Sequence, residues 1–207
     1  GDLQEKCDLV EEVTRLEGLD KIESLIPQAP AGDGLSQSQL RRRHVTHALA
    51  YNGYVEILPT PFIATDTFDT WGLNKDDERR NVVTVQNPLE ADRAVLGTTL
   101  LPSMLDAVRR NVVRGANDLA LYGVEQVAIN HGDGKSPMLD TSSRPSDEEV
   151  AHLRDTLPVQ PLYAATVACG NVEFEGPWGE GRAYTFADAI EAARTVARAA
   201  DVEITVE

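Results

Sequence analysis

Hydrophobic positions recur along the chain with the period of an amphipathic helix. Leu9, Val13 and Leu16 fall on one side of residues 8–17, and Gly18 follows as a residue that ends helices readily. Residues 100–114 show the same one-sided spacing through Leu101, Leu105, Val108 and Val112, and we expect this stripe to lie in the core or at an interface. The spacing and the capping residues predict further helices over residues 36–52, 65–71, 146–155 and 185–200.

Short apolar stretches between these helices predict strands. The longest cover residues 119–129 and 163–168, and shorter ones cover residues 54–58, 81–85 and 202–206. Strands with few crossover helices between them favour antiparallel pairing. We therefore expect an α+β fold in which a mostly antiparallel sheet is flanked by helices.

A change in composition predicts a boundary near the start of the chain. Residues 27–34 read Pro-Gln-Ala-Pro-Ala-Gly-Asp-Gly, which is typical of a linker. We expect residues 1–30 to be the tail of an upstream domain with a linker helix, and residues 31–207 to form the main domain. The apolar alternation still runs at Glu207, so we expect the sequence to be part of a longer chain.

The charge balance limits the partners that the chain can bind alone. Among 207 residues, 34 are Asp or Glu and 19 are Lys or Arg, which gives a net charge of −15. Affinity for phosphate groups comes mainly from clustered Lys and Arg. This composition argues against a free-standing nucleic-acid binder. The basic clusters at 41–43, 79–80 and 109–110 are interpreted as solvated faces or partner contacts.

The sequence argues against a membrane-spanning protein and against a small protein stabilised by disulfides. No run approaches the 18 apolar residues that a membrane-spanning helix needs. Cys7 and Cys169 provide neither a disulfide framework nor a zinc cage, and their low number suits a reducing cytoplasm.

Four carboxylates near the start are candidate metal ligands: Asp2, Asp8, Glu11 and Glu12. On a helix beginning at Asp8, positions i, i+3 and i+4 share one face, so several oxygens can surround a hard cation such as Mg²⁺. Two carboxylates ~4 Å apart repel by about 4 kcal/mol at an effective dielectric of 20, so the cluster needs a cation or open water. Open water remains the alternative, because acidic residues are favoured in a first helical turn.

Other candidate motifs give weaker evidence for a metal, phosphate or catalytic site. His44 and His47 lie three residues apart and can share a metal, but no third ligand lies nearby in the sequence. The glycine-rich segment 176–182 does not match a phosphate-binding loop and is interpreted as a hairpin loop. No nucleophile and base stand out as a pair. The residues alone thus indicate an α+β domain without an evident catalytic set.

Several segments together resemble a known family. They are Asp2-Leu-Gln-Glu-Lys-Cys-Asp8-Leu-Val-Glu11-Glu12 and its continuation to Ile22, Arg42-Arg43 with Gly53-Tyr54-Val-Glu56, Asn87-Pro88-Leu89, Thr98 to Pro102, Arg109-Arg110-Asn111, and Arg114-Gly115 with Asp118 to Leu121. Their order and spacing resemble the core of the beta subunits of bacterial-type phenylalanine–tRNA ligases. The likeness is close over residues 2–130 and loose over residues 131–207.

The resemblance implies a class II synthetase-like core that is catalytically silent, with phenylalanine and ATP reacting at the alpha subunit only. Residues 53–57 look like the class II motif that builds subunit interfaces. The family's Leu-Arg-Thr before Leu-Leu-Pro is absent, because Gly97 follows Leu96, and Tyr122-Gly-Val-Glu125 stands where the family has Phe-Glu-Ile-Gly. Without arginines to hold the phosphates, a domain cannot stabilise the charge on a transferring adenylate.

The resemblance also implies a cofactor and partners. The family places Mg²⁺ on the pattern Asp–x5–Asp–x2–Glu–Glu, which Asp2, Asp8, Glu11 and Glu12 match. The expected role is to support the alpha subunit in a cytoplasmic assembly of two alpha and two beta subunits, which contacts tRNA as a whole and no membrane. The region alone is expected to be inactive. The alternatives are a stand-alone acidic interaction or Mg²⁺-binding module, and an active synthetase-like enzyme.

Overall fold

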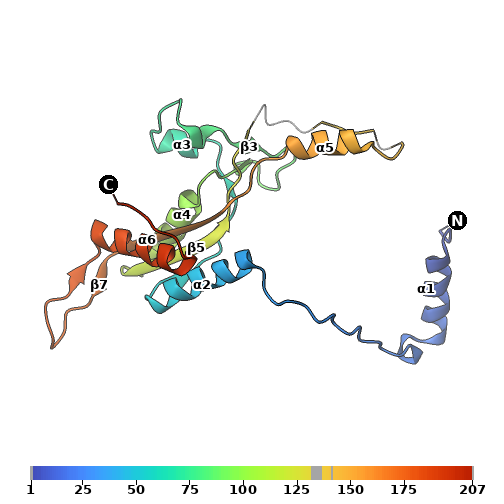
Figure 1. Ribbon diagram of the computed structural model, residues 1–207, viewed down its shortest axis with the longest axis horizontal. Helices are drawn as coiled ribbons and strands as arrows, with labels where there is room; N and C mark the ends of the chain where they lie inside the picture. The colour runs from blue at the N-terminus through green and yellow to red at the C-terminus, as the bar shows by residue number, and fades with distance from the viewer. Residues whose placement is uncertain (1, 132–136, 141, 207) are drawn as a thin grey trace. The chain divides into compact units, whose positions relative to one another are not determined.

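The structure is a computed structural model that describes residues 2–131, 137–140 and 142–206. The chain forms two compact units, residues 1–36 and residues 37–207. Figure 1 shows the helices and strands of both units along the chain.

The first unit contains helix α1 (Lys6–Glu17) and a short 3-10 turn, η1 (Leu19–Lys21). Glu5 and Asp8 form a reciprocal capping box at the start of α1, and the backbone N–H of Glu5 donates to Asp8 Oδ2 at 2.9 Å. The helix ends at Gly18, which has a positive φ of 106°. The predicted helix over 8–17 is confirmed and begins two residues earlier.

The second unit is organised around strand β5 (Leu119–Gln126). Strand β6 (Leu162–Cys169) pairs with β5 in antiparallel register along its whole length, from Leu119 opposite Cys169 to Gln126 opposite Leu162. The short strand β1 (Val55–Glu56) pairs with the other edge of β5 in parallel. The predicted α+β fold with a mostly antiparallel sheet is confirmed, since β1–β5 is the one parallel pairing recorded in the described chain.

Alternate side chains of β5 point to opposite faces of the sheet, and both faces are covered. On one face, Tyr122 and Val124 pack on Val45 and Leu49 of helix α2 (Gln37–Tyr51). Helix α6 (Phe186–Ala200) covers the same face beside α2, which Figure 1 shows at the centre of the unit. The predicted helices over 36–52 and 185–200 are therefore confirmed.

The opposite face of the sheet packs on helix α4 (Leu101–Val113). Leu121 and Val127 contact a cluster with Met104 and Ala107, and Met104 is fully buried. The stripe of Leu101, Leu105, Val108 and Val112 was predicted to lie in the core or at an interface. Only Val108 of the four packs against this core, whereas Leu101, Leu105 and Val112 remain 38%, 45% and 42% exposed.

A second small sheet has the strand order β2-β4-β3, formed by β2 (Phe62–Ile63), β4 (Val95–Leu96) and β3 (Val83–Thr84). Helix α3 (Thr67–Thr70) packs on it, and Phe68 joins Ile63 and Val95 in a small core. The sequence predicted α3 and β3 but missed β2 and β4, because two-residue strands are too short for an alternating pattern.

The remaining elements are helix α5 and a hairpin. Helix α5 (Asp147–Asp155) begins with the predicted capping box, in which the backbone N–H of Glu149 donates to Ser146 Oγ at 3.2 Å. Strands β7 (Asn171–Glu173) and β8 (Arg182–Ala183) form the hairpin predicted for the glycine-rich segment.

Two expectations about the rest of the chain have different outcomes. The predicted strand over 202–206 is wrong, since these residues form no strand and their apolar side chains are about half exposed. Part of the predicted polar loop, residues 132–136 and 141, lies outside the described residues.

In the described part of the chain, every helix is too short or too polar to cross a lipid bilayer.

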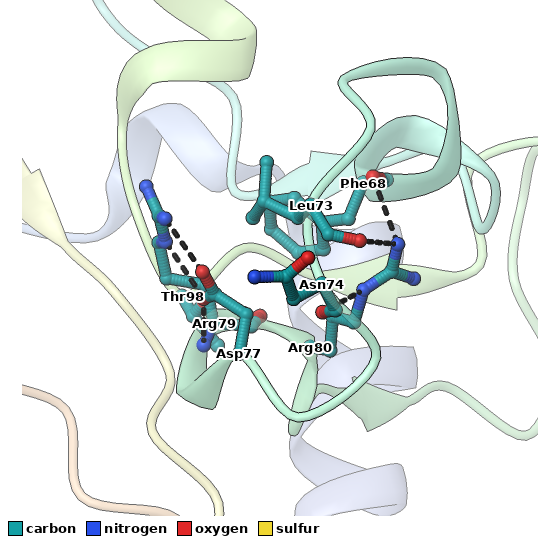
Figure 2. Close-up of polar contacts among 7 residues, drawn as sticks. All are labelled: Phe68, Leu73, Asn74, Asp77, Arg79, Arg80 and Thr98. Carbon is teal, nitrogen blue, oxygen red and sulfur yellow. Dashed lines mark hydrogen bonds and ion pairs between the residues drawn. The ribbon is translucent and has the colours of Figure 1, made fainter.

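Arg80 holds the long connection between β2 and β3 in place, as Figure 2 shows. It lies in the 3-10 turn η2 (Glu78–Arg80), and its side chain is only 22% exposed. Its guanidinium donates to the carbonyls of Phe68, Leu73 and Asn74 at 3.0, 2.6 and 2.8 Å. A fourth bond runs to Asp69 at 2.7 Å. The interpretation of residues 79–80 as a solvated face or partner contact is therefore wrong for Arg80.

The neighbouring Arg79 belongs to a separate and more exposed contact. Its guanidinium donates to both oxygens of Asp77, at 2.8 and 2.7 Å, and these bonds lower the pKa of Asp77 to about 2. The hydroxyl of Thr98 donates to the Arg79 carbonyl at 2.7 Å, which ties this turn to the start of α4 (Figure 2).

We predict that Arg80→Met lowers the free energy of unfolding of this unit by about 1–3 kcal/mol, because two half-buried carbonyls lose their donor. Amide exchange over residues 67–82 should rise with it. The matched variant Arg79→Met should change the free energy by less than about 1 kcal/mol, since its ion pair is exposed. Denaturant titration and hydrogen exchange measure both. Equal effects of the two substitutions would contradict the assignment of Arg80 as the anchor.

Candidate functional site: the β5–β6 ladder and its surroundings

The β5–β6 ladder carries no positive charge of its own. Strand β5 reads Leu-Ala-Leu-Tyr-Gly-Val-Glu-Gln and β6 reads Leu-Tyr-Ala-Ala-Thr-Val-Ala-Cys, without Arg or Lys. A site that transfers an adenylate group needs fixed cations or donors where the phosphate charge develops. The strands themselves therefore offer no group to clamp a triphosphate.

Arg42 reaches the ladder from helix α2, but its charge is already balanced. Its guanidinium donates to the carbonyl of Val124 at 3.1 Å and to Glu125 Oε1 at 3.3 Å. The contact joins residues 42–43, which carried the family resemblance, to residues 122–125, where the sequence departs from the family pattern. Its role here is to fix α2 against β5.

The middle of β5 has no room for a functional side chain. Gly123 is buried, and a Cβ there would overlap the ring of Pro59 and lie 3.2 Å from the sulfur of Met104. The neighbouring Tyr122 is buried on the other face, where burial first and Glu56 second raise the pKa of its phenol. Tyr122 is therefore neutral at physiological pH, and the one carboxylate of the ladder, Glu125, is paired with Arg42.

A hollow of about 360 Å³ lies beside helix α4 and strand β2. Phe62, Trp71 and Leu105 contribute apolar walls, and Arg93 and Asp106 line its polar side. Arg93 contacts one oxygen of Asp106 at 3.2 Å and Arg109 contacts the other at 3.5 Å. Asp66 and Asp92 line the hollow as well, so its three carboxylates and two arginines give it no preference for anions.

Three of the four predicted metal ligands can be placed in helix α1, and their contacts are local. Asp8 accepts backbone N–H bonds from Glu5 and Gln4, both at 2.9 Å, and these bonds lower the pKa of its carboxyl. Glu12 forms an ion pair with Arg15 at 2.6 Å, and Glu11 is exposed. Asp2, which precedes the helix, is exposed as well.

These carboxylates are not gathered into a metal-binding group. Within the residues that the structure places, no three His, Cys, Asp or Glu side chains come close enough together to hold an ion. His44 and His47 are both exposed on α2 and have no third ligand beside them. The donor set in this arrangement does not fit a bound Mg²⁺ ion, so the metal site remains a prediction.

Apolar side chains that the core leaves uncovered lie along one side of α4. Leu101, Leu105 and Val112 are about two-fifths exposed. They belong to the stripe that the sequence predicted to lie in the core or at an interface. Since Met104 and Ala107 fill the core, this stripe is available to a partner surface.

The fold places the chain in a class of proteins. Two structures of pyrrolysyl-tRNA synthetase from Desulfitobacterium hafniense are similar to it, with TM-scores of 0.51 and 0.53 at 11% and 12% identity. The matches cover 95% and 96% of this chain and 55% and 56% of those chains. The architecture is therefore that of a class II tRNA synthetase-like domain.

Sequence comparison then defines the family. The family profile of the phenylalanyl tRNA synthetase beta chain CLM domain matches residues 22–207. The chain is 66% identical to the phenylalanine–tRNA ligase beta subunit of Corynebacterium efficiens, 65% to that of Corynebacterium diphtheriae and 47% to that of Streptomyces avermitilis. These matches cover 98–100% of this chain and 24–25% of each relative.

The chain belongs to the phenylalanyl-tRNA synthetase beta chain family, and it spans about a quarter of the length of these relatives. The family resemblance drawn from the sequence is confirmed. Sequence reasoning missed the Arg80 anchor and the crowding at Gly123, since neither follows a repeating pattern. Arg80 bonds to groups 6 to 12 residues away, and Gly123 is crowded by Pro59 from a distant part of the sequence.

Proposed function

We propose that this chain is the non-catalytic, synthetase-like core of a phenylalanine–tRNA ligase beta subunit, and that it supports the alpha subunit at which phenylalanine and ATP react. The observation that carries the proposal is the β5–β6 ladder, which has no cation of its own and is packed by helices on both faces. The proposed assembly contains two alpha and two beta subunits, acts in the cytoplasm and contacts tRNA as a whole.

The absence of cationic side chains from the ladder argues for a supporting role. Fixed positive groups aimed at the developing charge usually supply a large share of transition-state stabilisation. Arg42 is the cation recorded against the ladder, and Glu125 balances it. A domain with this arrangement keeps the class II scaffold while leaving the chemistry to another subunit.

The exposed stripe on α4 supports a role in assembly. Fully burying one Leu or Val side chain contributes roughly 1.5–3 kcal/mol relative to leaving it exposed. Leu105 and Val112 lie seven residues apart on α4, so both sit on the same side of the helix and can be covered together. We place part of the contact with the alpha subunit on this stripe.

We predict that Leu105→Glu or Val112→Glu in the full-length beta subunit weakens its association with the alpha subunit at least tenfold, because a buried unpaired carboxylate is costly. Analytical ultracentrifugation of the mixed subunits measures the dissociation constant. Leu157→Glu is the matched control, since Leu157 is 50% exposed and lies away from α4 at the end of α5.

The control variant should assemble like the unmodified subunit. Normal assembly of the Leu105→Glu variant would remove α4 from the interface. Failure of the unmodified subunits to associate at micromolar concentration would contradict the supporting role itself.

The Mg²⁺ site on Asp2, Asp8, Glu11 and Glu12 is part of the proposal for the intact enzyme. In this account, groups beyond the region complete the site, because the local contacts of α1 do not gather the four carboxylates.

We predict that Glu11→Gln combined with Glu12→Gln lowers Mg²⁺ affinity of the two-subunit enzyme at least tenfold, as followed by competition with Mn²⁺ in electron paramagnetic resonance. These positions are preferable to Asp8, whose carboxylate also caps the helix. Asp20→Asn, an exposed change in the same unit, is the control. An unchanged affinity would contradict the ligand set. Tight binding by the isolated region would instead favour a stand-alone Mg²⁺ module.

A further inference from the structure

The hairpin formed by β7 and β8 ends in a tight turn with Trp178 at its tip. The backbone N–H of Gly176 donates to the carbonyl of Gly179 at 3.0 Å, and the reverse bond is 3.2 Å. Pro177 and Trp178 are the two residues between them. Figure 1 shows this hairpin extending away from the β5–β6 ladder.

The base of the hairpin is held by charge and by close backbone packing. The guanidinium of Arg182 donates to both oxygens of Asp188 at 2.8 and 2.9 Å and contacts Glu173 at 3.4 Å. Asp188 also accepts the backbone N–H of Thr185 at the start of α6, at 2.8 Å. These two donors hold the pKa of the Asp188 carboxyl well below its usual range, with Arg182 the larger cause.

Gly181 lets the two sides of the hairpin approach each other. Its φ is +71°, and a Cβ there would come within 2.6 Å of the Glu173 carbonyl oxygen and 2.7 Å of the Glu175 nitrogen. Contacts within the unit thus fix the base of the hairpin, as the Gly176–Gly179 bonds fix its tip. A binding element that is ordered beforehand loses less conformational entropy when it binds.

The hairpin presents aromatic side chains that nothing in the described part of its own unit covers. Trp178 is 100% exposed and Phe174 is 70% exposed. Trp is among the residue types most enriched where protein interfaces concentrate their binding energy. A rigid turn that carries an exposed Trp is therefore suited to fill an apolar socket.

The charges around Trp178 indicate which charges a partner surface would need beside an apolar socket. Residues 171–181 contain Glu173, Glu175 and Glu180 and no Lys or Arg. Phosphate-rich nucleic acid is disfavoured by these carboxylates. A second copy of this region is also disfavoured, because it has a net charge of −15. Lys and Arg suit both the carboxylates and the face of the indole ring.

We propose that the β7–β8 hairpin docks Trp178 into an apolar, Lys- and Arg-rimmed socket on the alpha subunit. This inference rests on the proposed function, because it deepens the supporting role by adding a second contact away from α4. It assigns Phe174 to the wall of the contact and Glu175 and Glu180 to its charged edge.

Hydroxyl-radical footprinting of full-length proteins tests the contact directly. In the isolated beta subunit, the indole of Trp178 should oxidise as a fully exposed tryptophan does. In the complex with the alpha subunit, its oxidation rate should fall at least tenfold. Equal oxidation in both samples would overturn the inference. Protection already present in the isolated beta subunit, or protection that needs tRNA, would assign the hairpin to another partner and overturn it as well.

Variants of the full-length beta subunit test how much the hairpin contributes to the affinity for the alpha subunit. Trp178→Ala should raise the dissociation constant for the alpha subunit about 30-fold, whereas Trp178→Phe should retain most of the affinity. Glu175→Gln with Glu180→Gln should weaken binding and reduce its dependence on salt. Leu89→Ala, which truncates another fully exposed apolar side chain, should leave the constant unchanged.

The two proposals fail in different ways. Loss of association between the unmodified subunits would contradict the proposed function and the hairpin contact together. Normal association that is unaffected by Trp178→Ala would overturn the hairpin contact alone.

Discussion

The pairing of β5 with β6, with helices packed on both faces of β5, is the constraint on which the second unit depends. Eight residues of β5 meet eight residues of β6 in continuous antiparallel register. Tyr122 and Val124 then require α2 and α6 on one side, and Leu121 requires α4 on the other. Since packing on both sides fixes the register, a shift of one residue would exchange every contact at once.

The same constraint bears on function through the arginines around the ladder. Five of them are held by a nearby partner: Arg42 by Glu125, Arg80 by backbone carbonyls and Asp69, Arg93 and Arg109 by Asp106, and Arg182 by Asp188. These contacts stabilise loops and join elements. They commit these five side chains to structural contacts.

Much of the fold is predictable from the sequence, because long helices and strands repeat their pattern several times. The helices α1, α2, α4, α5 and α6 and the strands β5 and β6 belong to this group. The pattern did not predict which side of α4 enters the core, since Met104 fits closely beneath Gly123, Ala107 joins the same cluster, and Leu101, Leu105 and Val112 remain partly exposed. The alternating apolar residues over 202–206 predicted a strand that the structure does not contain. A strand needs a second strand to pair with, and apolar spacing alone does not show whether one is present.

The contacts of the candidate functional residues were less predictable, because they also depend on neighbours that follow no repeating pattern. Arg80 looked like part of a basic cluster, but its partners Phe68 and Leu73 lie 12 and 7 residues away. The four carboxylates at 2–12 matched a family pattern, while local capping by Asp8 decides their arrangement in this unit. Spacing identifies chemical groups, but the competing hydrogen bonds decide which of them are available.

Nucleotide binding tests most directly whether this class II scaffold lacks the cationic side chains needed to bind a triphosphate. Isothermal titration of ATP with Mg²⁺ into the full-length beta subunit, in parallel with the alpha–beta complex, separates the two subunits. The account predicts no saturable binding by the beta subunit and clear binding by the complex. Stoichiometric ATP binding by the beta subunit alone, accompanied by pyrophosphate exchange with phenylalanine, would contradict it.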